Sequence, residues 1–127
     1  NVLLVRQYRT PAGRELLETP AGGIRPGESP EEAAQRELRE ETGFRAGALE
    51  LVYSFYSTPG FCTEFNHLFF ATDLTHDPLK GDDDEDITVV PVSQDQVLQM
   101  IQAQEIGDAK SVAGLLLYLM RTRDKAE

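Results

Sequence analysis

The sequence predicts an α/β protein in which a central mixed sheet lies between helices, an α/β/α sandwich. Two observations favour this class: apolar segments with the composition of strands recur along the chain, and three other segments carry helix signals. With 127 residues, of which 40% are hydrophobic, the chain has an ordinary size for one packed core. We therefore expect residues 1–127 to form a single domain.

Two strands are expected before the first helix. Residues 1–8 read NVLLVRQY and residues 14–20 read RELLETP, and both contain the apolar residues that strands favour. The chain starts inside the first of these patterns and without Met, so we expect that a preceding segment was removed or is disordered.

A tight loop is expected after the second strand. Residues 18–30, ETPAGGIRPGESP, contain Gly22, Gly23 and Gly27 beside two internal prolines. Such a loop exposes backbone carbonyls and lets a phosphate-bearing ligand approach closely. Gly22 is therefore a candidate substrate-binding residue.

This loop leads into a helix whose two ends are marked. Ser29 is a suitable N-cap, Pro30 suits the first helical position, and Glu32 completes a capping box. Gly43 tolerates the left-handed conformation in which helices commonly end. A helix is thus predicted over residues 30–42.

The last two turns of this helix carry an unusual group of acidic residues, Glu37, Glu40 and Glu41. Carboxylates there face the negative end of the helix dipole and repel one another, at a cost of roughly a few tenths of a kcal/mol for each pair. A run of Glu and Arg is commonly only a solvated helix face. The alternative is a bound divalent cation, which would turn the repulsion into attraction.

Three further strands and two helices are expected after this helix. The strands are residues 48–57, 65–74 and 86–93, and the helices cover residues 94–104 and 108–123. Apolar residues at helical spacing in the last helix are expected to form one core-facing stripe of Val112, Leu115, Leu116 and Leu119. No apolar run approaches the length of a membrane span.

The amino-acid composition limits which binding partners and which cellular compartment are expected. With 12 Lys and Arg against 22 Asp and Glu, the formal charge is −10, which argues against general nucleic-acid binding because that requires a basic surface. The single cysteine, Cys62, excludes an internal disulfide framework and suits a reducing cytosol. No signal peptide is recognised, so a cytoplasmic location is expected.

The glycine loop and the acidic helix together match a family motif. Gly22, five residues, Glu28, seven residues and then residues 36–44, RELREETGF, fit every specified position of the Nudix box, G-x5-E-x7-R-E-U-x-E-E-x-G-U, where U is bulky and apolar. The chain therefore resembles the Nudix hydrolases. This resemblance implies a single Nudix domain that cleaves a nucleoside diphosphate linked to another moiety, a small-molecule substrate, with the help of Mg²⁺.

The resemblance also assigns roles within the motif. The expected metal ligands are the carboxylates of Glu37, Glu40 and Glu41 and the backbone carbonyl of Ala21. Glu28 belongs to the same acidic cluster, and Arg36 is expected to orient the glutamates rather than contact the substrate. Because carboxylate and carbonyl oxygens accept both ions, Mn²⁺ is an alternative to Mg²⁺.

Residues outside the motif indicate the substrate. Pro59 lies sixteen positions beyond Gly43, like the marker proline of the ADP-ribose pyrophosphatase subfamily, and the wider pattern LLVRQYR, LETPAGG, FYSTPGFCTE and LFFATDL is similar to that subfamily. ADP-ribose is therefore the expected substrate, and other nucleoside diphosphate sugars stay open. By themselves, Pro59 and Gly60 would indicate only a turn.

Four more residues become candidates for the substrate site through this resemblance. Arg9 and Arg6 are expected to contact a substrate phosphate, although either could instead form a surface ion pair. Glu64 is expected near the metal ions or their waters, with a loop-capping role as the alternative. Phe61 either lines the substrate pocket or packs within its loop.

Residues 82–86 form an acidic run that composition alone would describe as a solvated loop. In ADP-ribose pyrophosphatases, a mobile loop brings a catalytic glutamate to the attacking water. That loop comes just before the strand that corresponds to residues 86–93 here. The resemblance therefore makes Glu85 the expected general base, with an Asp neighbour such as Asp83 as the alternative.

Two other functions remain open. A non-catalytic Nudix module could bind ADP-ribose as a sensor or pack against a partner, but such modules commonly lose glutamates that are all present here. A hydrolase could also act on a nucleoside triphosphate or a capped RNA, although the acidic composition disfavours long RNA. A homodimer is expected from the resemblance alone.

Overall fold

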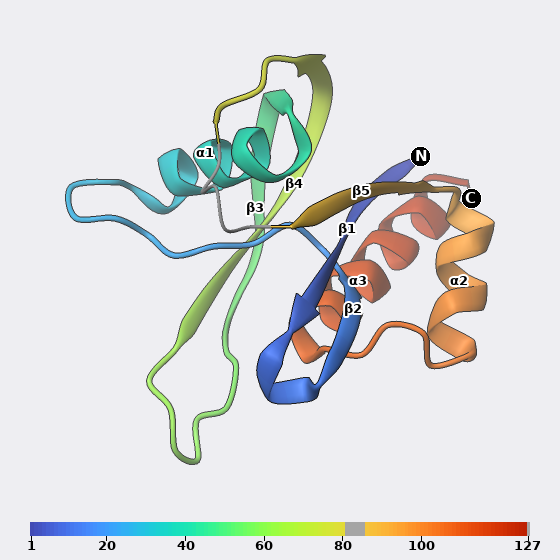
Figure 1. Cartoon of the computed structure of the whole chain (residues 1–127). Helices are drawn as coiled ribbons and strands as arrows, with labels where there is room; N and C mark the ends of the chain where they lie inside the picture. The colour runs from blue at the N-terminus through green and yellow to red at the C-terminus, as the bar shows by residue number, and fades with distance from the viewer. Residues whose placement is uncertain (81–85, 127) are drawn as a thin grey trace. The chain divides into compact units, whose positions relative to one another are not determined.

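The computed structural model describes residues 1–80 and 86–126, and these form an α/β protein as the sequence predicts (Figure 1). In chain order the elements are β1 (Val2–Arg9), η1 (Thr10–Ala12), β2 (Arg14–Glu18), α1 (Pro30–Thr42), β3 (Phe44–Tyr56), β4 (Phe65–His76), β5 (Ile87–Val92), α2 (Gln94–Gln102) and α3 (Ala109–Ala126). They fall into two compact units, one formed by Asn1–Thr19 with the chain from Asp86 onward and one that begins at Pro20.

The first unit contains an antiparallel sheet with the strand order β2-β1-β5. Val5 is paired with Glu18 on one side and with Val89 on the other, so β1 is the central strand. Helices α2 and α3 complete this unit, and its core consists of Leu4, Leu17, Val92, Val97, Ile106 and Leu115. The sheet therefore buries the apolar residues that the N-terminal sequence pattern indicated.

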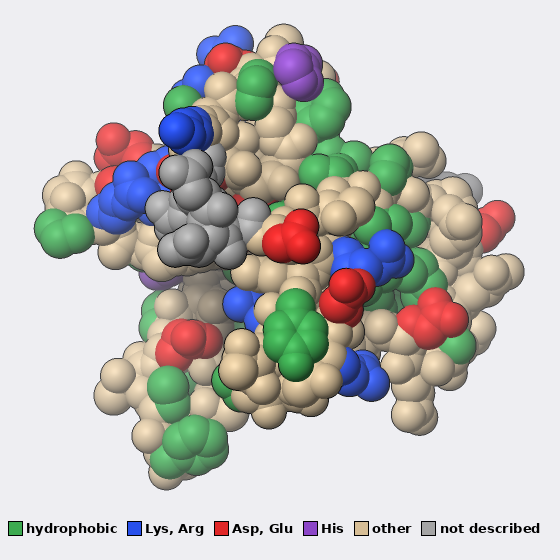
Figure 2. Space-filling model, viewed as in Figure 1, with side chains coloured by type: hydrophobic (Ala, Val, Ile, Leu, Met, Phe, Trp, Pro, Cys, Tyr) green, Lys and Arg blue, Asp and Glu red, His purple; other side chains and the backbone are tan. Residues whose placement is uncertain are grey.

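The second unit contains an antiparallel ribbon of β3 and β4, with α1 beside it (Figure 1). The side-chain amide of Gln35 on α1 donates to the carbonyl of Ala46 on β3 at 2.9 Å and accepts from its N–H at 2.8 Å. This pair of bonds fixes the helix against the strand. Tyr56 and Phe65, the last pair of the ribbon, and Phe61 in the loop that joins its strands have exposed side chains. Figure 2 shows several hydrophobic side chains, coloured green, at the surface of the molecule.

Both ends of α1 agree with the sequence prediction. The hydroxyl of Ser29 accepts from the N–H of Glu32, and the carboxylate of Glu32 accepts from the N–H of Ser29, which completes a capping box. At the other end Gly43 has a φ of 80° and donates its N–H to the carbonyl of Arg39. The helix that carries the acidic residues is thus delimited by local sequence.

The C-terminal helices differ from the prediction in three respects, one of which is that α3 continues to Ala126 instead of ending at residue 123. Helix α2 ends at Gln102, two residues early, and Gln104 then adopts a left-handed conformation with a φ of 61°. On α3, Leu115 is 2% exposed whereas Leu116 is 43% exposed. The expected stripe was therefore wrong for Leu116, because successive residues of a helix point about 100° apart and only one of the two faces the core.

Among the residues that the structure describes, no helix is long and apolar enough to cross a membrane.

We expect Leu115→Ala to lower the free energy of unfolding by about 2–5 kcal/mol, because it removes a buried side chain from the core and leaves a cavity. The matched control is Leu116→Ala on the same helix, which should cost less than about 1 kcal/mol because this side chain is partly solvated. Urea denaturation followed by circular dichroism measures both. Equal losses would contradict the placement of α3.

Candidate active site

The motif residues of α1 and of the loop before it gather around the guanidinium of Arg36. Its Nε and Nη2 donate to the two carboxylate oxygens of Glu28, at 2.7 and 3.0 Å. Nη1 donates to Glu37 at 2.8 Å and to Glu40 at 3.2 Å. Nη2 also donates to the backbone carbonyl of Gly23 at 2.9 Å. The positively charged side chain of Arg36 therefore binds the loop at Gly23 and also binds three carboxylates, those of Glu28, Glu37 and Glu40.

The electrostatics of this cluster follow from those contacts. Hydrogen bonds from the Arg36 guanidinium, together with one from the N–H of Arg25, lower the pKa of Glu28 to about 2. The same pairing with Glu28 raises the pKa of Arg36 above its usual range. The Glu28–Arg36 pair thus stays ionised at neutral pH, and the cluster contains more carboxyl groups than guanidinium groups.

A second link joins the loop to the end of the helix. The N–H of Ala21 donates to Oε2 of Glu41 at 3.0 Å, which brings together two residues that the sequence predicted to share a site. Pro20 precedes Ala21 and has no N–H of its own. Glu41 therefore holds the first backbone N–H after Pro20.

The missing side chain of Gly22 is essential to this arrangement. A Cβ atom at Gly22 would overlap the carboxylate of Glu37, whereas a Cβ at Gly23 would meet nothing within 4 Å. The Glu37 carboxylate thus lies directly against the backbone of the loop. The sequence predicts close approach of a ligand at Gly22, and the structure shows close approach of a protein carboxylate there.

The donor chemistry of this cluster fits a hard divalent cation. Its carboxylates and backbone carbonyls are oxygen donors, which Mg²⁺ and Mn²⁺ prefer, and the excess negative charge favours a cation. In the described part of the chain, however, no three carboxylate, histidine or cysteine side chains form a ready ligand set. Glu37 and Glu40 bind Arg36, and Glu41 binds the backbone, so these side chains would have to rotate to coordinate a cation.

The two arginines predicted to contact a substrate phosphate form ion pairs in the first unit. Arg9 binds both carboxylate oxygens of Glu18, at 2.7 and 3.0 Å, and Arg6 lies 3.9 Å from Glu15. Glu18 is 4% exposed and also accepts from Lys110 at 2.8 Å.

Burial raises the pKa of Glu18, but hydrogen bonds from Arg9 and Lys110 outweigh it, so the net pKa lies below the usual value. Glu18 and Lys110 were not among the predicted residues, because two residues 92 positions apart give no local sequence signal of their contact.

The loop between β3 and β4 begins as a turn. The N–H groups of Phe61 and Cys62 donate to the carbonyl of Thr58, so Pro59 occupies a turn position, as the alternative interpretation proposed. Phe61 is 88% exposed and does not pack within the loop, and Glu64 is exposed. The predicted general base Glu85 and its alternative Asp83 lie outside the described residues.

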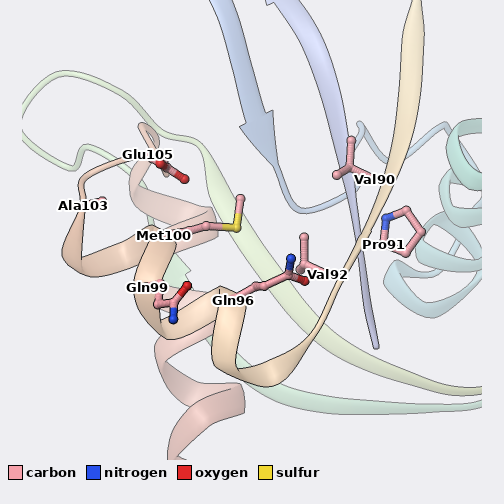
Figure 3. A pocket seen from close by; sticks show the side chains of 8 residues that line it. All are labelled: Val90, Pro91, Val92, Gln96, Gln99, Met100, Ala103 and Glu105. Carbon is pink, nitrogen blue, oxygen red and sulfur yellow. The ribbon is translucent and has the colours of Figure 1, made fainter.

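One hollow is lined by none of the predicted site residues. It has a volume of about 550 Å³, is wide open, and lies in the first unit between β5 and α2. Val92 and the side chains of Gln96 and Met100 line it, together with Glu105 beyond the helix (Figure 3). No sequence motif pointed to this hollow.

Comparisons with known proteins agree with the motif. A family model described as NUDIX domain matches residues 1–114. The ADP-ribose pyrophosphatase of Bacillus subtilis (strain 168) is 38% identical over 112 residues, which are 87% of this chain and 60% of that protein. The GDP-mannose pyrophosphatase of Enterobacter sp. (strain 638) is 38% identical over 129 residues, 94% of this chain and 66% of that protein.

A solved structure described as "Crystal structure of ADP compounds hydrolase" superposes with a TM-score of 0.85 at 30% identity. The match covers 98% of this chain and 66% of that one. The chain thus spans 60–66% of the length of the relatives named here.

Gly22→Ala is expected to displace the Glu37 carboxylate and to weaken Mn²⁺ binding by about 10-fold or more, because a displaced ligand loses its orientation. Electron paramagnetic resonance of free Mn²⁺ measures the dissociation constant. Gly23→Ala is the matched control, since its Cβ enters open space. The interpretation fails if both variants bind Mn²⁺ like the unsubstituted chain.

Glu28 should make stability depend on pH in acid solution. Its pKa in the folded protein, about 2, lies below the value of about 4.3 expected for an unfolded chain. The ionised carboxylate therefore stabilises the fold above about pH 4.3, and this stabilisation is lost as the pH falls toward 2. Melting temperatures should show Glu28→Gln well below the unsubstituted chain at neutral pH and the difference shrinking in acid. A constant difference would refute the Arg36–Glu28 pairing.

Proposed function

This chain belongs to the NUDIX domain family, and we propose that it is a metal-dependent hydrolase of a nucleoside diphosphate sugar. One observation carries the proposal: Glu28, Glu37 and Glu40 surround Arg36 at the end of α1, while Glu41 holds the backbone of the glycine loop. This places all the acidic residues of the family motif on one helix end and the loop that faces it. A cation held by these carboxylates would offset the negative charge of a diphosphate.

ADP-ribose is the substrate that we favour. The name of the Bacillus subtilis relative and the position of Pro59 support it, whereas the Enterobacter relative supports GDP-mannose as the alternative. Both substrates are nucleoside diphosphate sugars, so the same chemistry at phosphorus applies to each. Cleavage of ADP-ribose would yield AMP and ribose 5-phosphate.

The mechanism assigns separate tasks to the side chains. Glu37, Glu40 and Glu41 would hold the cation together with the Ala21 carbonyl, and Arg36 would orient the glutamates. When bound, Mg²⁺ or Mn²⁺ would supply charge neutralisation at the diphosphate and a more acidic water. Arg9 and Arg6 bind a substrate phosphate, and the exchange of their carboxylate partners for phosphate oxygens accompanies substrate binding.

Proton transfer from the attacking water is assigned to Glu85, which lies outside the described residues. General-base catalysis of this kind contributes about 10²–10⁴-fold to the rate, whereas charge stabilisation at the metal site carries the larger share. Phe61 and Glu64 contribute to the substrate side of the site, next to the turn at Pro59. The proposal also includes that the chain forms a single Nudix domain, that it acts in the cytoplasm and that it forms a homodimer.

One observation favours a second candidate, a module that binds the nucleotide without cleaving it. The three glutamates expected to hold the cation are engaged by Arg36 and by the Ala21 N–H instead. If those contacts persist with metal present, the chain would bind ADP-ribose as a sensor. Binding without turnover distinguishes this candidate from the enzyme.

The test of the proposal is release of AMP from ADP-ribose in the presence of Mg²⁺, with EDTA as the control and with parallel assays of GDP-mannose and ATP. We expect rapid release from ADP-ribose that EDTA abolishes. Faster cleavage of GDP-mannose would keep the enzyme and change the substrate. Saturable binding of ADP-ribose without release of AMP would instead make the chain a sensor.

We expect Glu41→Gln to abolish turnover more completely than Glu85→Gln. Glu41→Gln removes the charge of a metal ligand, although its amide oxygen can still accept from the Ala21 N–H, whereas Glu85→Gln removes only the base. Steady-state kinetics of the two variants provide the comparison. The reverse order would contradict the roles assigned to these residues.

A further inference from the structure

The backbone of Arg25 is fixed by a turn in the loop before α1. Residues 25–28 form a β-turn, which a hydrogen bond from the N–H of Glu28 to the carbonyl of Arg25 closes at 3.0 Å. Gly27 has a φ of 84° and follows Pro26, which is what a type II turn requires at its two central positions. The carboxylate of Glu28 also accepts from the N–H of Arg25 at 2.8 Å. Both backbone polar groups of Arg25 are therefore held by Glu28.

The side chain of Arg25, in contrast, is exposed and weakly held. It is 60% exposed, and its Nη2 lies 3.7 Å from Oε1 of Glu40. This distance is too long for a hydrogen bond, and exposed ion pairs contribute little to stability. Within the described part of the chain, Glu40 is the only carboxylate with which the Arg25 side chain forms an ion pair. The guanidinium can therefore leave Glu40 without a large loss of stability.

The other oxygen of Glu40 is bound by an arginine that is firmly held. Oε2 of Glu40 accepts from Nη1 of Arg36 at 3.2 Å, and the Arg36 side chain is only 12% exposed. Arg36 also binds both carboxylate oxygens of Glu28. If Glu40 turned to a divalent cation, Arg36 would keep Glu28 as its partner, whereas Arg25 would lose the carboxylate that it pairs with.

We infer that Arg25 is a further substrate-binding residue, which exchanges Glu40 for a phosphate oxygen of the substrate when a metal ion binds. The inference rests on the proposed function, in which Glu40 is a metal ligand and the substrate carries a diphosphate. It uses only contacts within the second unit. Arg25 occupies an unspecified position of the family motif, so the motif itself assigns it no role.

Charge and geometry both support this exchange. A divalent cation on Glu40 would repel the nearby guanidinium, and the diphosphate attracted by that cation would supply new negative charge. A guanidinium can bind phosphate oxygens with two parallel N–H groups, which makes arginine suited to this task. The turn at Arg25 fixes the start of the side chain, so only the side chain has to move.

The test compares two quantities that should change in opposite directions in Arg25→Met. This substitution removes the charge and leaves the backbone bonds of the turn in place. Mn²⁺ should bind about two- to fivefold more tightly, because a positive charge beside Glu40 is lost. The KM for AMP release from ADP-ribose at saturating Mg²⁺ should rise about 10-fold, because a charge-assisted hydrogen bond is lost. The kcat should stay within about twofold, as expected when binding is lost equally from the ground state and the transition state.

Arg45→Met is the matched control, and Arg25→Lys is a second variant. The Arg45 side chain is 56% exposed and lies 3.5 Å from Asp77, in the same unit. Its substitution removes the same charge from a similar exposed pair, so the Mn²⁺ dissociation constant and the KM should each stay within about twofold. Arg25→Lys keeps the charge but loses the paired N–H groups, and an intermediate KM is expected.

Three results would overturn the inference. The first is a KM in Arg25→Met within about twofold of the unsubstituted chain, where a 10-fold rise is expected. The second is an equal rise of KM in Arg45→Met, which would indicate an effect of net charge alone. The third is a rise of KM accompanied by weaker Mn²⁺ binding in Arg25→Met, which would indicate damage to the loop.

The same measurements separate this inference from the proposed function. If the unsubstituted chain binds Mn²⁺ but releases no AMP, the proposed hydrolase fails. The dissociation constant of ADP-ribose in the presence of Mn²⁺, measured by calorimetry, then replaces KM in every comparison, with the same expected direction. If the unsubstituted chain binds no Mn²⁺, the proposed function and the inference fail together.

Discussion

The candidate site depends on the hydrogen bonds and ion pairs that the guanidinium of Arg36 makes. It binds the carboxylates of Glu28, Glu37 and Glu40 and the carbonyl of Gly23, so it holds an acidic helix end together and ties it to the loop in front. Without the positive charge of Arg36, the glutamates would repel one another at the negative end of the helix dipole. The cluster has more carboxylates than guanidinium groups, and a divalent cation would neutralise this excess negative charge.

The local features of the site were predictable because their signals lie close together in sequence. Ser29, Glu32 and Gly43 delimit α1 as their types require, and the Nudix fold implied by the motif is confirmed by the family match and by the superposition with a solved structure. The resemblance to the Nudix family also predicted that Arg36 would orient the glutamates. Its partners Glu28, Glu37 and Glu40 are consistent with that role.

Features that depend on tertiary contacts were not predictable from the sequence. Lys110 and Ser111 contact Glu18 and Thr19 across 92 positions, and no local pattern marks such pairs. Apolar character alone did not separate Leu115, which is buried, from Leu116, which is partly exposed. The burial of charged and polar groups at the end of β2 is decided by the helix that covers it, and that helix lies at the far end of the chain.

The central claim is that the acidic end of α1 is completed by a divalent cation. Anomalous diffraction from crystals grown with Mn²⁺ tests it most directly. We predict a peak about 2–2.5 Å from oxygens of Glu37, Glu40, Glu41 and the Ala21 carbonyl, with the side chains rotated away from Arg36 where needed. A cation bound only elsewhere, or no cation while Arg36 still holds Glu37 and Glu40, would contradict the claim.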